Sequence, residues 1–251
     1  MADLSITDEV SRKLRMNALL LGIKLLRSAK DIPSEAKRPL RDFGYRMSVC
    51  QSFHLARYEG PTIAMLSEDM WCSEPVIGYG FKEPPKDFMD GHTRYPADTA
   101  TLEAGSHCAH ELPKLEVGKY VGVVIAPLKW AKFEPDLVMI YCNTLQLNML
   151  LLGMEWKDGY NLKCAISSHA SCIYSVVPIL LGGKWQITIP CRGDRYYAMA
   201  GDGEIIFTCP MGKFNDLRTG LRYLETTGSK LPCGNALRIE YSPHESGEVY
   251  A

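Results

Sequence analysis

From residue 119 onward, short apolar segments rich in β-branched residues alternate with longer apolar segments, and this alternation constrains the fold more than any other feature. The segments typical of buried strands span residues 120–126, 136–141, 161–166 and 185–190. Between them lie two predicted helices, at residues 144–152 and 168–181, each followed by glycine. Strands separated by helices indicate an α/β or α+β fold, so we expect a mixed, partly parallel sheet with flanking helices.

The remaining pattern completes this sheet at both ends. In the first half we expect a helix and then a strand within residues 5–27, a helix at 46–57 and a short strand at 62–66. Near the C-terminus, residues 196–199 and 204–208 flank Gly201-Asp202-Gly203, which is favourable chemistry for a tight turn. We therefore expect a C-terminal hairpin, followed by a helix that begins after Pro210.

The length of 251 residues fits a single α/β domain, which we place at residues 1–230. Residues 80–118 are rich in Gly, Pro, His and Asp, and we expect an irregular insertion there. Irregular insertions often border a site. We expect residues 231–251 to form a weakly ordered tail.

Charge and cysteine usage exclude several classes of partner. The net charge of −1 leaves no excess of basic residues for a nucleic-acid backbone. No apolar run approaches the ~20 residues that span a bilayer, and no export signal is visible. Nine cysteines form an odd set without the spacing of a disulfide scaffold, so we expect reduced thiols in the cytoplasm. A small-molecule ligand is the expected partner, and an oligomer is compatible with the sequence.

The strongest candidate for a site is the turn at residues 189–195, Ile-Pro-Cys-Arg-Gly-Asp-Arg, where a predicted strand ends. A thiol at Cys191 between Arg192 and Arg195 has its thiolate favoured by Coulomb attraction. The alternative is that Cys191 is a small buried hydrophobe and that the arginines pair with surface carboxylates. The sequence does not decide between these interpretations.

Other cysteines lie at similar junctions. Cys142 follows a predicted strand, Cys172 lies in the first turns of a predicted helix, and Cys209 precedes Pro210. Helix N-termini stabilise thiolates, although cysteines at such positions more often serve packing.

Two further groups combine thiols with histidines. Cys50, His54 and Arg57 share one face of the helix at 46–57. The segment 107–110, His-Cys-Ala-His, matches no zinc spacing. The sequence also contains no P-loop, no dinucleotide-binding glycine fingerprint and no Gly-x-Ser-x-Gly elbow, which argues against nucleotide-driven and serine-hydrolase chemistry.

Together, the order of several short segments resembles one known family. They are Gly22-Ile23-Lys24-Leu25-Leu26, Met47-Ser48-Val49-Cys50-Gln51 with Ala56-Arg57, Cys72 before Ile77-Gly78, Ala126-Pro127-Leu128 with Glu134-Pro135-Asp136, Gln146, Cys172, the turn at 191–195 and the passage around Pro210. They resemble domain of unknown function 169, a family of mostly anaerobic archaea and bacteria with no assigned activity. The resemblance implies that Cys50, Cys72, Cys172 and Cys191 occupy family cysteine positions, and that Cys142 and Cys209 belong to the core.

Three functional hypotheses follow. The first is a cytosolic enzyme acting on a small anionic or carbonyl-bearing molecule, with Cys191 or Cys172 as thiolate and Arg195 beside it. In this hypothesis Arg192, Gln146 and Gln51 bind the substrate.

The second hypothesis is a protein that holds a metal ion or an iron–sulfur cluster as cofactor through Cys50, Cys72, Cys172 and Cys191. The third is a non-catalytic binding or sensor module for a small ligand, with its pocket covered by residues 80–118.

Overall fold

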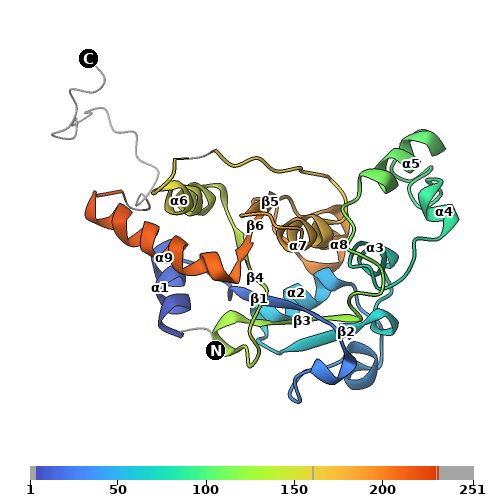
Figure 1. Cartoon of the computed structure of the whole chain (residues 1–251), viewed down its shortest axis with the longest axis horizontal. Helices are drawn as coiled ribbons and strands as arrows, with labels where there is room; N and C mark the ends of the chain where they lie inside the picture. The colour runs from blue at the N-terminus through green and yellow to red at the C-terminus, as the bar shows by residue number, and fades with distance from the viewer. Residues whose placement is uncertain (1–3, 160, 230, 232–251) are drawn as a thin grey trace.

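A single sheet lies between two layers of helices in the computed structural model, which describes residues 4–159, 161–229 and 231. One layer contains α1 (Leu4–Leu14), α6 (Thr144–Glu155) and α9 (Met211–Thr226). The opposite layer contains α2 (Val49–Tyr58), α3 (Ser73–Gly78), α7 (Ser171–Leu180) and α8 (Arg192–Ala198). Figure 1 shows the sheet edge-on between these layers. No helix in the described part of the chain is both long and apolar enough to cross a membrane.

The sheet has six strands in the order β2-β3-β1-β4-β6-β5. They are β1 (Leu21–Leu26), β2 (Ile63–Leu66), β3 (Gly122–Pro127), β4 (Leu137–Cys142), β5 (Gln186–Thr188) and β6 (Ile205–Pro210). Every ladder between these strands is antiparallel, so the expected mixed α/β architecture is confirmed but the partly parallel sheet is wrong. The sheet is antiparallel because β1 lies between β3 and β4. Strands β3 and β4 run in the same direction, but β1 lies between them and pairs with both.

The expected C-terminal hairpin is also wrong in its first arm. Residues 192–198 form helix α8, and β6 pairs instead with β5, on the other side of this helix in the sequence. Asp194 and Ala198 are buried, whereas Tyr196 and Tyr197 are both exposed, which is the pattern of a helix with one buried face. The strand expected at residues 161–166 is absent, and residues 161–167 have no regular secondary structure.

Alternation along the central strands divides the core between the two faces of the sheet. In β4, Leu137, Met139 and Tyr141 join a cluster with residues of α2, α3 and α7. Val138, Ile140 and Cys142 face the other way and pack with α1, α6 and α9. Successive side chains of a strand point to opposite faces, so β4 contributes to both clusters. Cys142 and Cys209 both lie in the second cluster.

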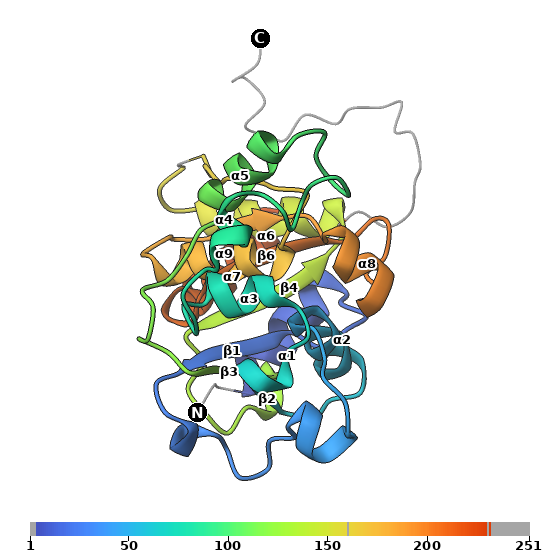
Figure 2. The ribbon, with the colours of Figure 1, turned by 90° about the vertical axis from the view of Figure 1, so that its right-hand side faces the viewer.

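The insertion at residues 80–118 contains two short helices, α4 (Lys86–Met89) and α5 (Leu102–Glu111), which lie beyond α3 (Figure 2). They meet at Gly91 and Gly105, where a Cβ on Gly91 would lie 2.3 Å from the carbonyl oxygen of Leu102. Gly91 also has a φ of +93°, so a side chain at this position would both clash with the backbone of α5 and strain its own backbone. Apart from Leu231, the expected tail lies outside the described residues.

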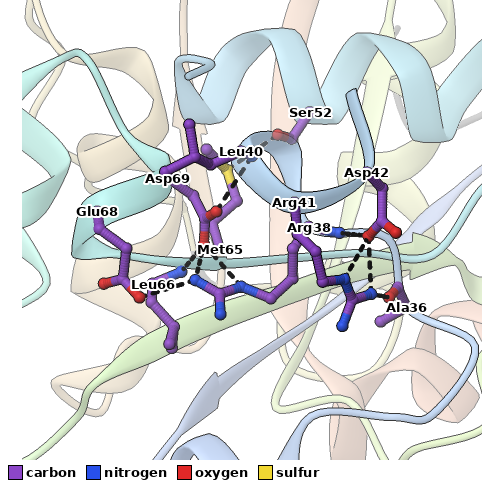
Figure 3. A network of polar contacts seen from close by, with 10 residues as sticks. All are labelled: Ala36, Arg38, Leu40, Arg41, Asp42, Ser52, Met65, Leu66, Glu68 and Asp69. Carbon is purple, nitrogen blue, oxygen red and sulfur yellow. Dashed lines mark hydrogen bonds and ion pairs between the residues drawn. The ribbon is translucent and has the colours of Figure 1, made fainter. Parts of the chain in front are cut away.

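A buried ion pair fixes the chain on both sides of α2 (Figure 3). The Asp69 carboxylate is fully buried and accepts hydrogen bonds from Arg38 Nε at 2.9 Å, Arg38 Nη2 at 2.6 Å and the backbone N–H of Leu66 at 2.9 Å. The backbone then links Asp69 to the start of α2, because Met47 N–H donates to Asp69 O at 2.9 Å and Trp71 N–H donates to Met47 O at 3.2 Å. This network places Trp71 and Cys72 beside the N-terminus of α2.

Candidate functional site

Four cysteines from separate segments line one cavity of about 450 Å³. Cys50 lies in the first turn of α2, Cys72 directly precedes α3, Cys172 lies in the first turn of α7 and Cys191 directly precedes α8. The cavity therefore lies where the N-termini of four helices on the same face of the sheet converge.

The position of α2 is set by a capping box. Ser48 Oγ accepts from Gln51 N–H at 3.1 Å, and Gln51 Oε1 accepts from Ser48 N–H at 2.8 Å. The same Gln51 oxygen accepts a hydrogen bond from Trp71 Nε1 at 3.0 Å. Gln51 thus holds the helix start and an indole at the cavity, and its amide oxygen is already used by these two groups.

The sulfur of Cys191 is surrounded by hydrogen-bond donors. Ser171 Oγ donates to Cys191 Sγ at 3.3 Å, and the thiol of Cys50 and the backbone N–H groups of Ser171 and Asp194 also bond to this sulfur. The bond from Cys50 is the largest cause that lowers the pKa of Cys191; with the bonds from Ser171 it outweighs burial and brings the pKa to about 4. This donor set favours the thiolate form of Cys191.

The residue before α7 helps to build this donor set. Ala170 adopts φ 50° and ψ 47°, a left-handed conformation that is unfavourable for a residue with a Cβ. This conformation precedes Ser171, whose N–H and O–H both reach Cys191. Backbone strain of this kind, which costs roughly 1–3 kcal/mol, is concentrated at functional sites.

The two neighbouring thiols titrate in the opposite direction. Hydrogen bonds to Cys172 and Cys191, together with burial, raise the pKa of Cys50 well above its usual value. For Cys172 the interaction with Cys50 acts to lower the pKa, but burial together with the negative charges of Cys191, Glu74 and Asp194 outweighs it, and the net direction is upward. Burial raises the pKa of Cys72 to about 12. Among the four cysteines of the cavity, only Cys191 is stabilised as an anion.

A buried carboxyl group lies behind Cys191. Asp194 Oδ2 accepts hydrogen bonds from Ser171 Oγ at 3.2 Å and from Tyr141 Oη at 2.9 Å. Burial, followed by the negative charge of Cys191, raises the pKa of Asp194 to about 7. Ser171 has a single hydroxyl hydrogen for two acceptors, so Cys191, Ser171 and Asp194 form a short chain along which a proton can be exchanged.

A buried cation contacts the Tyr141 ring at the end of this hydrogen-bonded series. The Arg57 guanidinium carbon lies 3.7 Å from the centroid of the Tyr141 ring, and its Nη1 donates to Glu204 Oε1 at 2.7 Å. The Arg57 side chain is only 1% exposed. His54, on the same helix, packs on Tyr58 at 4.9 Å between ring centroids. The helix face expected to combine Cys50, His54 and Arg57 thus contributes its thiol to the cavity, while Arg57 acts through Tyr141.

Aromatic rings form the outer rim of the cavity. Trp71 and Tyr197 meet edge to face at 5.1 Å between ring centroids, and Tyr196 meets Tyr197 at 5.1 Å. All three rings line the cavity while remaining substantially exposed. They offer flat apolar surface to a molecule that enters.

The insertion supplies the charged wall of the cavity. Arg94 bonds to the half-buried Glu74 and lies 3.6 Å from Asp98, which also faces Arg192 Nη1 at 3.6 Å and His169 Nδ1 at 3.9 Å. Burial raises the pKa of Glu74 against the effect of Arg94, and burial lowers the pKa of His169. Two arginines and two carboxyl groups therefore nearly balance in charge here.

Three of the predicted ligand contacts have other partners. Arg195 donates to the backbone oxygens of Pro190 at 3.2 Å and Gly201 at 2.8 Å, so it holds the turn around α8. Gln146 caps α6 and donates to Leu14 O at 2.8 Å, in the opposite helix layer. Arg192 lines the cavity at its mouth with its side chain 81% exposed. Hydrogen bonds, and not the flanking guanidinium groups expected from the sequence, thus account for the Cys191 thiolate.

No cluster of three or more His, Cys, Asp or Glu side chains among the described residues has the geometry of a metal site. This includes the four cysteines of the cavity and the segment 107–110, which lies on α5. Of the four thiols, those of Cys50 and Cys191 contact the Ser171 hydroxyl.

Sequence reasoning missed the residues that activate Cys191. Ser171 and Tyr141 come from α7 and β4, and each meets Asp194 only through the tertiary fold. The one local signal was Asp194 itself, an acidic residue in the turn already singled out around Cys191. Glu74, Arg94 and His169 carried no sequence signal that linked them to this turn.

Comparison with known proteins gives family membership without an activity. The family model described as Uncharacterised ArCR, DUF169, matches residues 9–220. The uncharacterized protein MJ0308 of Methanocaldococcus jannaschii is 24% identical over 200 residues, which cover 78% of this chain and 84% of that protein. No solved structure matches the chain.

Proposed function

The chain belongs to the DUF169 family, and from the site described above we propose that it is a cytoplasmic enzyme in which the Cys191 thiolate attacks a small electrophilic molecule in the cavity. The observation that carries this proposal is the donor set around Cys191 Sγ, with Ser171 Oγ at 3.3 Å. A preformed thiolate is the nucleophile of cysteine-dependent catalysis. The eight cysteines of the described residues are all free, as a reducing compartment requires.

Asp194 is the proton-transfer group of this proposal. A carboxyl group with a pKa of about 7 exists in both protonation states at neutral pH, which is the condition for general acid–base catalysis. Ser171 contacts both Asp194 and Cys191, so it links the Asp194 carboxyl group to the place where an adduct forms on the sulfur.

The cavity favours a small, carbonyl-bearing substrate with an apolar portion. About 450 Å³ accommodates a small metabolite but not a folded partner. The nearly balanced charge of the wall argues against a highly charged anion, while Arg192 at the mouth can accept one carboxylate. The rim formed by Trp71, Tyr196 and Tyr197 supplies apolar contact.

Limited alkylation tests the proposal. With less than one equivalent of iodoacetamide at neutral pH, we expect peptide mapping to find Cys191 modified first, ahead of Cys50, Cys72 and Cys172. The Cys191→Ser variant serves as the matched control and should lose this fast phase only. Uniform slow modification of all cysteines, or first modification of Cys72, would remove the basis for the proposed nucleophile.

The alternative of cofactor binding through Cys50, Cys72, Cys172 and Cys191 has one observation in its favour, since all four line the same cavity, and one against it, since no three of them in the described structure have the geometry of a metal site. Four thiolates suit zinc or an iron–sulfur cluster. Metal analysis after anaerobic purification distinguishes this function, because a folded, metal-free protein with a reactive Cys191 is expected only for the enzyme. Saturable ligand binding without turnover would instead identify a binding or sensor module.

A further inference from the structure

A second thiol lies directly against the proposed nucleophile. Cys50 from α2 and Cys191 at the start of α8 both contact the Ser171 hydroxyl, at 3.9 Å and 3.3 Å. Helices α2 and α8 pack against each other, and Cys50 is the largest of the influences that lower the pKa of Cys191. A simple addition to a carbonyl group uses one sulfur, whereas two sulfurs in contact are what disulfide formation requires.

The depth of the pair limits which oxidant can reach it. Cys191 is 9% exposed and Cys50 is 5% exposed, and both line the cavity. The disulfide of a folded protein cannot enter this space, but a small molecule with a weak O–O bond can. The aromatic rim at Trp71 and Tyr197 adds apolar contact for a substituent on that molecule.

We propose that Cys191 and Cys50 form a redox pair that reduces a small hydroperoxide in the cavity. This assignment rests on the proposed function, because it uses the same Cys191 thiolate. The thiolate attacks the terminal oxygen of ROOH, an S–O bond forms, the O–O bond breaks, and the departing RO⁻ takes a proton from water to become an alcohol. Cys191 is thereby oxidised to sulfenic acid by two electrons.

The second step joins the two sulfurs. Cys50 attacks the sulfenic sulfur of Cys191, an S–S bond forms, and the hydroxyl leaves as water with the proton of the Cys50 thiol. An external dithiol then returns two electrons and two protons and becomes a disulfide itself, so the cycle balances. Cys50 shares the Ser171 hydroxyl with Cys191, which makes Cys50 rather than Cys172 the thiol that resolves the sulfenic acid.

Mass spectrometry of the whole chain after one equivalent of hydrogen peroxide tests the pair. In the reduced protein at neutral pH we expect a Cys50–Cys191 disulfide as the main product, and no disulfide in Cys191→Ser. In Cys50→Ser we expect the disulfide to be lost and dimedone to trap a sulfenic acid on Cys191. The control Cys142→Ser removes a buried thiol of the opposite core and should leave the product unchanged.

Other products overturn the pair. A Cys191 that passes to sulfinic acid without a disulfide in the wild-type protein, or a disulfide to Cys172 in place of Cys50, contradicts the assignment. The wild-type product gives this answer even if a variant fails to fold. A small aliphatic hydroperoxide, used beside hydrogen peroxide, should give the same disulfide at a higher rate if the aromatic rim binds the substituent.

The two proposals fail in different ways. If iodoacetamide modifies Cys191 first but peroxide yields no Cys50–Cys191 disulfide, the redox pair is wrong and the nucleophile remains. If the disulfide forms although Cys191 is alkylated no faster than the other thiols, the two sulfurs are neighbours but the preformed Cys191 thiolate is wrong, and with it both the nucleophilic enzyme and the peroxide step that starts from that thiolate.

Discussion

The hydroxyl of Ser171 makes a measurable contribution to the Cys191 thiolate. Ser171→Ala removes one donor at 3.3 Å from the sulfur and leaves the backbone donors in place. A hydrogen bond to a charged group contributes about 1.5–3 kcal/mol. Since about 1.4 kcal/mol corresponds to one pKa unit, the pKa of Cys191 should rise from about 4 by roughly 1 to 2.

The assay is the rate of Cys191 alkylation as a function of pH. The rate follows the thiolate fraction, so the wild-type profile should be level above about pH 5 and fall below it, with its midpoint set by the pKa of about 4. The Ser171→Ala profile should have the same shape with its midpoint moved to higher pH by roughly 1 to 2.

Ser175 offers a matched control on the same helix. It is fully buried one turn after Ser171, and its hydroxyl donates to Cys172 O at 3.3 Å. Ser175→Ala should therefore leave the alkylation midpoint of Cys191 unchanged. Equal midpoints for wild type and Ser171→Ala, or equal displacements in both variants, would refute the assignment of Ser171 as a donor to the thiolate.

Three further perturbations follow from the same contacts. The raised pKa of Asp194 stabilises the fold at low pH and this contribution is lost as pH rises toward about 7, whereas the lowered pKa of Cys191 adds stability from about pH 4 upward. In Asp194→Asn only the second effect remains, so urea unfolding should show the variant gaining stability relative to wild type between pH 5 and pH 7; a constant difference contradicts this. Asp69→Asn leaves Arg38 without its buried partner and should lower the free energy of unfolding by about 3 kcal/mol, while Asp42→Asn, in a largely solvated pair, should have a much smaller effect. Gln51→Ala removes the capping box and the partner of Trp71 Nε1, so it should cost about 1 kcal/mol and change the tryptophan fluorescence, whereas an unchanged spectrum contradicts the contact.

Local patterns in the sequence located most strands and helices but not their pairing. Residues 120–126 and 136–141 anticipated β3 and β4 because β-branched and apolar side chains suit a buried sheet. Which strand becomes the neighbour is a long-range property, and β1, over a hundred residues earlier, separates these two. The local pattern of Tyr196 and Tyr197 indicated a strand, but burial of Asp194 beside Tyr141 places them on a helix.

The sequence located the candidate site through Cys191 but gave the wrong reason for the stability of its thiolate. The turn at residues 189–195 drew attention because a thiol lies between two arginines, yet Arg195 binds backbone oxygens and Arg192 is exposed. The groups that stabilise the thiolate come from α2 and α7, and no spacing in the sequence relates Cys50 or Ser171 to Cys191. The cofactor hypothesis required Cys50, Cys72, Cys172 and Cys191 to lie together, and all four line one cavity.

The ionisation state of Cys191 can be read from the ultraviolet absorbance of thiolates during a pH titration of the reduced protein, with Cys191→Ser as the reference. We predict that the difference between the two proteins contains one thiolate that is fully formed at neutral pH and disappears near pH 4. A difference that appears only above pH 8, as for an ordinary cysteine, would contradict the assignment of Cys191 as a preformed thiolate.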